Sequence, residues 1–330
     1  MSSLRQGRCG RSGQAGNPSY LPSCTFLVRR GMRGLRAARE EFQAETAETI
    51  DMDQALEAKR QKLIDLFREM GGCVIGFSGG VDSTFLFAVA ARVLGERALA
   101  VTVTSEIHAE WELREAKELA AEIGGRHRVI TVRALDIPGF ADNPEDRCYH
   151  CKIGVFGELR AVAEEERLPY VADGSNVDDR SDYRPGRAAL KELGVKSPME
   201  EAGLCKADIR ELSKAMELPT WNKPSFACLA SRFPYGTPIT RENLTVVGSA
   251  EEALRDLGLR TLRVRHHGDV ARLELGPEEF GRVIDGLREE VVRRVKEAGY
   301  TYVALDLQGY RTGAMNEALK ARSESRGGSH

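Results

Sequence analysis

The sequence has 330 residues, of which 42% are hydrophobic and 30% are charged, as is typical of a globular protein large enough for two domains. Its formal net charge of −2 argues against a bulk nucleic-acid or membrane surface. No run of the sequence approaches the roughly 20 apolar residues that a membrane helix needs. We therefore expect no nucleic-acid partner and no membrane partner.

The first 51 residues differ from the rest of the chain. From Met1 to Arg39 there are eight arginines, no lysine and no acidic residue. An arginine-rich, acid-poor start is also typical of a transit peptide. Little apolar periodicity is present, however, which favours a disordered extension. Residues 1–51 and the tail 323–330 are therefore predicted to be disordered.

From residue 54 onward, helical and strand patterns alternate. Helices are predicted over 56–70, 83–94, 110–123 and 153–166, and strands over 73–77, 98–104, 128–132 and 170–172. This alternation predicts an α/β fold, a parallel sheet with helices on both faces. After Tyr235 a helix over 242–256, strands over 261–266 and 271–275, a helix over 277–298 and a strand over 302–305 predict a smaller α/β unit. The expected domains are 52–235 and 236–322.

The stretch SGGVDS, residues 78–83, joins the first predicted strand to a helix. Such a turn presents unpaired amide N–H groups at the positive end of a helix, which is an anion site. Gly79 and Gly80 let the backbone approach phosphate oxygens, Ser78 and Ser83 add hydroxyl donors, and Asp82 could hold Mg²⁺. The alternative is a strand–turn–helix junction with incidental glycines, but an acid and two serines have little packing value in so tight a turn. The loop is neither a Walker P-loop nor G-x-G-x-x-G.

SGGVDS resembles the PP-loop of the ATP pyrophosphatases, which cleave ATP between the α and β phosphates. The resemblance implies that Ser78, Gly79, Gly80, Val81, Asp82 and Ser83 bind the nucleotide. Five further segments are similar to the LarE family, namely RCYHCK (147–152), ADGSNVDDRSDYRPGRAAL (172–190), SPMEEAGLCKADIRELS (197–213), LPTWNKPSFACLASRFPYGTPIT (218–240) and RVRHHGD (263–269). LarE proteins are ATP-dependent sulfurtransferases. They adenylate a carboxylate of pyridinium-3,5-biscarboxylic acid mononucleotide and replace its oxygen with sulfur, for the nickel-pincer cofactor of lactate racemase.

The source of the sulfur divides this family into two types. In one, a single cysteine gives up its own sulfur; in the other, three cysteines hold a 4Fe-4S cluster whose open iron carries the sulfide. Cys228 matches the family's cysteine position and this sequence also has Cys148 and Cys151, so the resemblance implies the cluster type. Thiolates are the usual ligands of such clusters. Structural zinc normally takes four ligands, and the fourth is not obvious because His150 is awkwardly placed between two cysteines.

The remaining cysteines have no assigned role. Seven cysteines, unevenly spread, do not read as a disulfide framework, which favours a reducing cytoplasm. Cys73 lies in a strand that is expected to be buried, where it acts as a small hydrophobe. Cys205 precedes a predicted helix.

The family's substrate is a phosphorylated dicarboxylate, so further cations are needed. Arg263 and Arg265 alternate with apolar residues on a predicted strand, which points both guanidinium groups to one face, either as a phosphate site or as a solvated surface. The resemblance favours the phosphate site and implies a catalytic role for Arg232, together with Cys228 and Asp82. The expected substrate-binding residues are Trp111, Ser231, Arg232, Glu251, Arg263 and Arg265.

Several expectations are less specific. Trp111 and Glu106 follow the second strand, where the nucleotide or substrate ring would bind, although an aromatic there is also a routine core residue. Glu251 and Glu252 lie on a helix where solvated glutamates are common. Asp173 and Asn176 follow a strand at the edge where parallel sheets bind ligands. A charged loop, which is either a lid or simply mobile surface, contains Asp178, Asp179, Asp182 and Arg184.

Two other functions share parts of this pattern. A tRNA thiolase would also have a PP-loop and three cysteines, but the near-neutral charge weighs against it. A silent nucleotide-binding regulator would not need the cysteines. The expected protein is a cytoplasmic homo-oligomer, possibly a hexamer, that uses ATP, Mg²⁺, a 4Fe-4S cluster, a mononucleotide substrate and a sulfide donor.

Overall fold

The computed structural model describes residues 54–180, 185–224, 227–311 and 314. The chain divides into two units, Met1–Met52 and Asp53–His330, and the described residues all belong to the second. The two segments predicted to be disordered, 1–51 and 323–330, lie outside the described residues. Within the described part, every helix is too short or too polar to cross a membrane.

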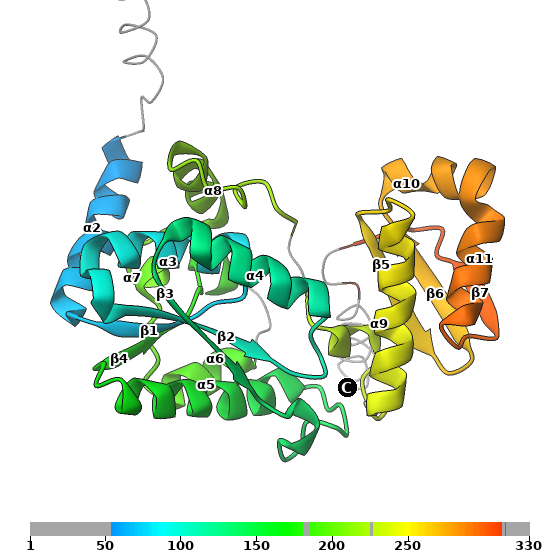
Figure 1. The fold of residues 1–330 in the computed structure, drawn as a ribbon, viewed down its shortest axis with the longest axis horizontal. Coiled ribbons are helices and arrows are strands. Elements are labelled where there is room, and N and C mark those ends of the chain that lie inside the picture. The colour runs from blue at the N-terminus through cyan, green and yellow to red at the C-terminus, as the bar shows by residue number, and fades with distance from the viewer. Residues whose placement is uncertain (1–53, 181–184, 225–226, 312–313, 315–330) are drawn as a thin grey trace, which may run out of the picture. The chain divides into compact units, whose positions relative to one another are not determined.

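A four-stranded sheet forms the centre of the first part (Figure 1). Its strands run in the order β3-β2-β1-β4, and all neighbouring pairs are parallel. They are β1 (Cys73–Gly76), β2 (Ala98–Thr104), β3 (Arg126–Thr131) and β4 (Tyr170–Ala172). The central strand β1 is an apolar run whose Cys73, Val74 and Ile75 are fully buried, as expected for a parallel strand covered on both faces.

Helices cover both faces of this sheet, as predicted. α2 (Gln54–Met70), α3 (Val81–Leu94) and α4 (Glu110–Ile123) lie on one side, and α5 (Arg147–Glu165) and α6 (Gly186–Glu192) lie on the other (Figure 1). α5 packs Phe156 and Leu159 against Val74 and Leu99. Shorter helices, α7 (Pro198–Glu201) and α8 (Lys206–Ala215), follow β4. Single 3-10 turns are η1 (Gly95–Arg97), η2 (Ala134–Asp136), η3 (Val177–Arg180) and η4 (Leu229–Arg232).

A three-stranded sheet forms the second part. It has the order β5-β6-β7, with β5 antiparallel to β6 and β6 parallel to β7. Its elements are α9 (Arg241–Asp256), β5 (Leu262–His267), β6 (Val270–Leu275), α10 (Pro277–Arg282), the π-helical segment η5 (Val283–Leu287), α11 (Arg288–Glu297) and β7 (Tyr302–Leu305). Leu262, Val264 and Leu273 occupy alternate strand positions and enter the core.

One hydrophobic core includes residues on both sides of Tyr235. Leu229 and Phe233, which precede it, pack in the same cluster as Val247 of α9 and Val264 of β5. The segment around Cys228 is therefore held by the second part of the chain through apolar packing. The domain boundaries at 52, 235 and 322 stay predictions.

Several predicted helices have different bounds in the structure, and three of the differences bear on the fold or the site. α3 begins at Val81 rather than residue 83, and α5 begins at Arg147 rather than residue 153, which places Cys148 and Cys151 in its first turns. The early start of α5 is supported by one local and one tertiary contact, because the buried Arg147 donates to Asn143 Oδ1 and lies over the Tyr235 ring. The helix predicted over 277–298 is interrupted by η5, whose end contains Gly286, a poor helix former.

Candidate functional site

The SGGVDS turn runs directly from β1 into α3. The Ser78 and Ser83 hydroxyls lie 3.1 Å apart, Ser83 Oγ accepts from the Ser78 amide at 3.2 Å, and Gly80 N donates to Ser78 Oγ at 3.4 Å. Thr84 N donates to Gly80 O at 3.0 Å and so begins the helix. The first amides of a helix have no partner inside it, so this turn places a rigid set of donors at the positive end of α3.

Gly79 gives the turn its shape. Its φ of 68° lies in the left-handed region, and a Cβ there would come within 3.3 Å of Ala116 Cα on α4. Lys223 Nζ donates to Gly79 O at 2.8 Å and pairs with Glu115 at 2.9 Å. Because the carbonyl and the amide of one peptide point in opposite directions, this contact fixes the direction of the Gly80 N–H.

Asp82 is engaged on both of its oxygens. Its Oδ2 forms an ion pair with Lys206 Nζ, and its Oδ1 accepts from Asn176 Nδ2 at 3.4 Å. Lys206 comes from the start of α8 and Asn176 from the loop after β4. No role for Lys206 or Lys223 follows from the sequence, because no spacing rule links either of them to SGGVDS. Only their positions inside two segments that resemble the LarE family could have drawn attention to them.

The carboxyl end of β4 carries a buried polar group, as expected. Asp173 is buried and accepts from Ser175 Oγ and from Ser197 Oγ, the latter at 2.7 Å, while Lys152 Nζ lies 3.6 Å from it. Asn176 is also buried, and its amide donates to Asp179 Oδ2 at 3.0 Å.

The charged loop that was considered as a lid lies only partly within the described residues. Asp178 Oδ2 accepts from the Lys206 amide at 2.9 Å, so it caps α8. Asp179 is buried on the Asn176 amide. Asp182 and Arg184 lie outside the described residues.

The fold brings Cys148, Cys151 and Cys228 together. Cys148 and Cys151 lie on successive turns at the start of α5, and Cys228 immediately precedes η4. The pKa of the Cys151 thiol is raised to about 12, chiefly by burial and in part by the charges of Cys228 and Cys148. Burial also raises the pKa of Cys228, which Arg147 partly offsets and Cys148 reinforces. Each thiol thus lies within electrostatic reach of the other two.

The donor set fits an iron–sulfur cluster better than zinc. Three soft thiols are gathered, whereas His150 points to Asp146, with Nε2 3.6 Å from Oδ2. Among the described residues, no group of three or more His, Cys, Asp or Glu side chains is already close enough to hold a metal ion. The fit is therefore one of ligand chemistry and proximity. Cys73 and Cys205 lie elsewhere, in β1 and at the N-cap of α8.

Arg232 holds the segment that carries Cys228. Its Nη1 donates to Ala227 O at 2.5 Å and to Cys228 O at 2.9 Å. It also donates to Ser231 Oγ at 2.9 Å, and two further N–H groups pair with Glu251. Leu229 N donates to Ile107 O at 2.9 Å, which ties the same segment to the chain after β2.

Glu251 is buried in this arrangement and is paired with Arg232. Its Oε1 accepts from Arg232 Nε at 2.8 Å and from Val264 N at 2.9 Å. Burial raises the pKa of this carboxyl, but the charge and hydrogen bonds of Arg232 outweigh burial and hold it below its ordinary value. Glu252, the neighbouring acid, is exposed.

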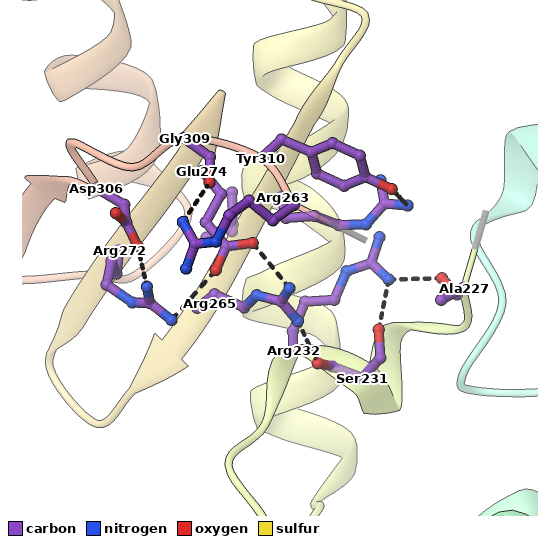
Figure 2. Close-up of polar contacts among 12 residues, drawn as sticks. Ala227, Ser231, Arg232, Arg263, Arg265, Arg272, Glu274, Asp306, Gly309 and Tyr310 are labelled. Atoms are coloured by element: carbon purple, nitrogen blue, oxygen red, sulfur yellow. Dashed lines mark hydrogen bonds and ion pairs between the residues drawn. The ribbon is translucent and has the colours of Figure 1, made fainter. Parts of the chain in front are cut away.

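Arg263 and Arg265 share one face of β5, as the alternation predicted (Figure 2). Arg265 donates to Ser231 O at 2.6 Å and to Glu274 Oε2 at 2.8 Å. Arg263 donates to Leu262 O at 2.8 Å and lies 5.0 Å from the Tyr310 ring centre. Both arginines are buried rather than solvated. Burial lowers the pKa of Arg263, and the Arg232 charge lowers it further.

Positive charge is concentrated on this face. Arg272 of β6 lies on it as well, paired with Asp306 and with Glu274 Oε1 at 3.2 Å (Figure 2). Arg265 and Arg272 both pair with Glu274, and Arg272 also pairs with Asp306, while Arg263 lies beside them on the same face. A buried excess of guanidinium groups suits an anionic ligand such as a phosphate or a carboxylate.

α4 contributes a further carboxyl with a shifted pKa, that of Glu112. Burial raises the pKa of Glu112 to about 7, while the Arg232 charge lowers it and the Glu251 charge raises it. The charges of Arg255 and Lys223 lower the pKa of this carboxyl as well. The guanidinium carbon of Arg255 lies over the Trp111 ring, 4.6 Å from the ring centre. Glu106 accepts from Ala134 N at 3.0 Å and from Arg241 at 2.9 Å.

Comparison with known proteins identifies relatives of this chain. A profile of the asparagine synthase family matches residues 72–147. An uncharacterized protein of Synechocystis sp. is 42% identical over 80% of this chain and 99% of its own length. The pyridinium-3,5-bisthiocarboxylic acid mononucleotide synthase of Lactiplantibacillus plantarum is 36% identical over 80% of this chain and 96% of its own.

Proposed function

The chain belongs to the LarE family of PP-loop proteins, and we propose that it is an ATP-dependent sulfurtransferase of that family. In this proposal it adenylates a carboxylate of pyridinium-3,5-biscarboxylic acid mononucleotide and replaces one of its oxygens with sulfur. The product would then enter the biosynthesis of the nickel-pincer cofactor of lactate racemase.

One observation carries the proposal: three cysteines lie within electrostatic reach of one another in a chain that is 36% identical to a bisthiocarboxylic acid synthase. Cys148 and Cys151 are neighbours on α5, but Cys228 reaches them only through the packing of η4. A structural role does not need three reduced thiols within electrostatic reach of one another. A 4Fe-4S cluster with one open iron for the sulfide does.

The first step is adenylation. A substrate carboxylate oxygen attacks the α phosphorus of ATP, the α–β phosphoanhydride bond breaks, and pyrophosphate leaves with the electron pair. Amides of Gly80 and of the first turn of α3, with the hydroxyls of Ser78 and Ser83, would hold the leaving phosphates. Asp82 would hold Mg²⁺, which prefers carboxylate and phosphate oxygens.

The second step is sulfur transfer. A hydrosulfide sulfur attacks the carbonyl carbon of the acyl adenylate, the carbon–oxygen bond to AMP breaks, and a thiocarboxylate remains after loss of the proton. Cys148, Cys151 and Cys228 would hold a 4Fe-4S cluster, which when bound supplies an open iron for the sulfide. Arg232 keeps Cys228 in place through the carbonyl oxygens of residues 227 and 228.

The arginine face of β5 would anchor the substrate. Arg263 and Arg265 are buried on one side of that strand. Arg265 also contacts Ser231, which follows Cys228 by three residues. A phosphate held there would leave the pyridinium carboxylates free to reach the thiols. Trp111 and Arg232 remain candidates for contacts with the ring and the carboxylate. A cytoplasmic homo-oligomer, such as a hexamer, and a sulfide donor complete the proposal.

The test is a turnover assay on anaerobically reconstituted protein with ATP, sulfide and the dicarboxylate mononucleotide. We expect AMP and pyrophosphate in equal amounts, and a product mass that reports exchange of oxygen for sulfur. Formation of ADP and phosphate would contradict the adenylation step. Transfer of sulfur to tRNA instead would identify a tRNA thiolase, and loss of H₂S from Cys228 would identify a sacrificial cysteine.

A further inference from the structure

The ion pair between Asp82 and Lys206 joins two helix beginnings. Asp82 lies in the first turn of α3 and Lys206 is the first residue of α8. Their side chains are 26% and 28% exposed, so the pair faces solvent rather than a sealed core. Asn176 Nδ2 contacts the other Asp82 oxygen at 3.4 Å.

A lysine is an unusual residue at the start of a helix. The positive end of the helix dipole disfavours a cation there, and acidic residues are preferred. α8 already has such residues, because Asp208 accepts from the Cys205 amide at 3.0 Å and Asp178 accepts from the Lys206 amide at 2.9 Å. The Lys206 ammonium is therefore not needed by its own helix.

The pair is also not needed to join α8 to the rest of the fold. Ile209 and Leu212 of α8 are buried, and Lys59 of α2 pairs with Asp208 at 2.7 Å. A partly exposed ion pair adds little to the free energy of unfolding beyond such contacts. The position of Lys206 is better explained by the site that it faces, the anion-binding turn at Ser78–Ser83.

Resting on the function proposed above, we propose that Lys206 is the counter-ion of Asp82 in the nucleotide-free protein and exchanges it for the phosphates when Mg²⁺·ATP binds. The divalent cation takes the Asp82 carboxylate, which displaces the ammonium. The flexible lysine stem then carries the released charge to the phosphate oxygens beside it. No bond forms or breaks in this exchange, and the proton stays on the lysine.

The exchange has two consequences that can be measured separately. Before nucleotide arrives, Lys206 competes with a divalent cation for Asp82 and keeps the cation weakly bound. After nucleotide arrives, Lys206 adds a charge-assisted contact to the phosphates. Removing the ammonium must therefore strengthen binding of the metal alone and weaken binding of ATP alone. A residue with a merely structural role would change both in the same direction or neither.

The test compares wild type with Lys206→Met, which keeps the length of the stem and removes the charge. Mn²⁺ binding to nucleotide-free protein is measured by electron paramagnetic resonance, and ATP binding in EDTA by calorimetry. We expect Mn²⁺ to bind about two- to fivefold more tightly and metal-free ATP to bind about tenfold more weakly. Lys214→Met, on the exposed side of the same helix, should match wild type in both.

Two further variants keep the result decisive. Asp82→Asn combined with Lys206→Met should abolish the gain in Mn²⁺ affinity, which identifies Asp82 as the site. Lys206→Arg keeps the charge and should stay near wild type for Mn²⁺ even if the methionine variant folds poorly. Unchanged or weaker Mn²⁺ binding in a folded Lys206→Met protein, or unchanged ATP binding, overturns the exchange. Failure of the wild type itself to bind ATP would instead overturn the proposed function.

Discussion

The guanidinium of Arg232 and the carboxylate of Glu251 form a two-point ion pair inside the protein. Nε lies 2.8 Å from Oε1 and Nη2 lies 2.7 Å from Oε2, and the two residues are 2% and 5% exposed. Through this pair, α9 holds Arg232 in place. The Nη1 atom of Arg232 donates to the carbonyl oxygens of Ala227 and Cys228. Glu251 therefore acts on the cysteine segment through Arg232.

Breaking this pair should destabilise the protein strongly. Glu251→Ala leaves the Arg232 charge buried without its partner and the Val264 amide without its acceptor. Removing one member of a buried ion pair costs about 3–5 kcal/mol in the free energy of unfolding. Chemical denaturation of the apoprotein measures it.

The control replaces the other member of the pair and then both. Arg232→Met combined with Glu251→Leu should lose less than the sum of the two single substitutions, because neither charge is then left alone. Additive losses, or a loss below about 1 kcal/mol for Glu251→Ala, would mean that the pair contributes only as an ordinary surface ion pair does.

Iron content should depend on three cysteines and not on the others. Anaerobically reconstituted protein should hold about four irons per chain, by analogy with cubane clusters. Cys148→Ala, Cys151→Ala and Cys228→Ala should each lose most of the iron, as measured by colorimetric iron and sulfide analysis.

Cys205→Ser is the matched control for the three alanine variants. Cys205 is the N-cap of α8, and serine is a good N-cap residue, so iron content and stability should be retained. Full iron content in any of the three alanine variants would remove that cysteine from the cluster.

Arg263 should distinguish the two ligands of the enzyme. Arg263→Ala removes a charge-assisted contact worth roughly 1.5–3 kcal/mol, so the Kd of the mononucleotide should rise about ten- to a hundredfold while that of ATP stays unchanged. Arg265→Ala should weaken mononucleotide binding similarly, and should also loosen the contact with Ser231. Separate calorimetric titrations with each ligand measure both effects.

Arg293→Ala is the control, because Arg293 lies on the exposed side of α11 and is paired there with Glu290 and Glu297. It should leave both affinities near their wild-type values. If Arg263→Ala and Arg265→Ala weaken ATP as much as the mononucleotide, or weaken neither, the pair does not bind the substrate phosphate.

Gly79→Ala should damage nucleotide binding through the backbone. A left-handed φ of 68° costs a residue with a Cβ about 1–2 kcal/mol, and the new Cβ would also press on Ala116. We expect lower stability on thermal denaturation and weaker ATP binding. Gly95→Ala has a similar φ of 55° with free space around its Cβ, so it should lower stability alone. Equal ATP affinity in the two variants would contradict a precise role for Gly79.

Glu112 should make stability fall as the pH rises. The folded protein holds the pKa of this carboxyl at about 7, above its ordinary value of 4.5, so between these values the folded state keeps a proton that the unfolded state releases. Stability attributable to Glu112 is therefore lost from pH 4.5 to about 7 and is constant above. Glu112→Gln should remove this component, whereas Glu122→Gln, exposed on the same helix, should keep it. If the free energy of unfolding changes with pH in the same way in wild type and in Glu112→Gln, the pKa of Glu112 is not raised in the folded protein.

Local chemistry was readable from the sequence because neighbouring residues determine it. The strand of residues 98–104, the helix of 110–123 and the turn between β1 and α3 follow from short-range periodicity and from two glycines at a helix start. The alternation of Arg263 and Arg265 with Leu262 and Val264 likewise predicted one face of β5. These features need no knowledge of distant residues.

Contacts between distant segments were decided only by the tertiary structure. Nothing in the spacing of Lys206 indicates that its ammonium meets Asp82, and nothing in that of Glu251 indicates that it pairs with Arg232. A solvated surface stayed an alternative for Arg263 and Arg265 until packing showed both to be buried. Periodicity tells which face of an element a side chain occupies. The partner of a side chain in a distant segment depends on how whole elements pack. A buried charge is unfavourable unless it is paired, and packing decides which opposite charge lies close enough to pair with it.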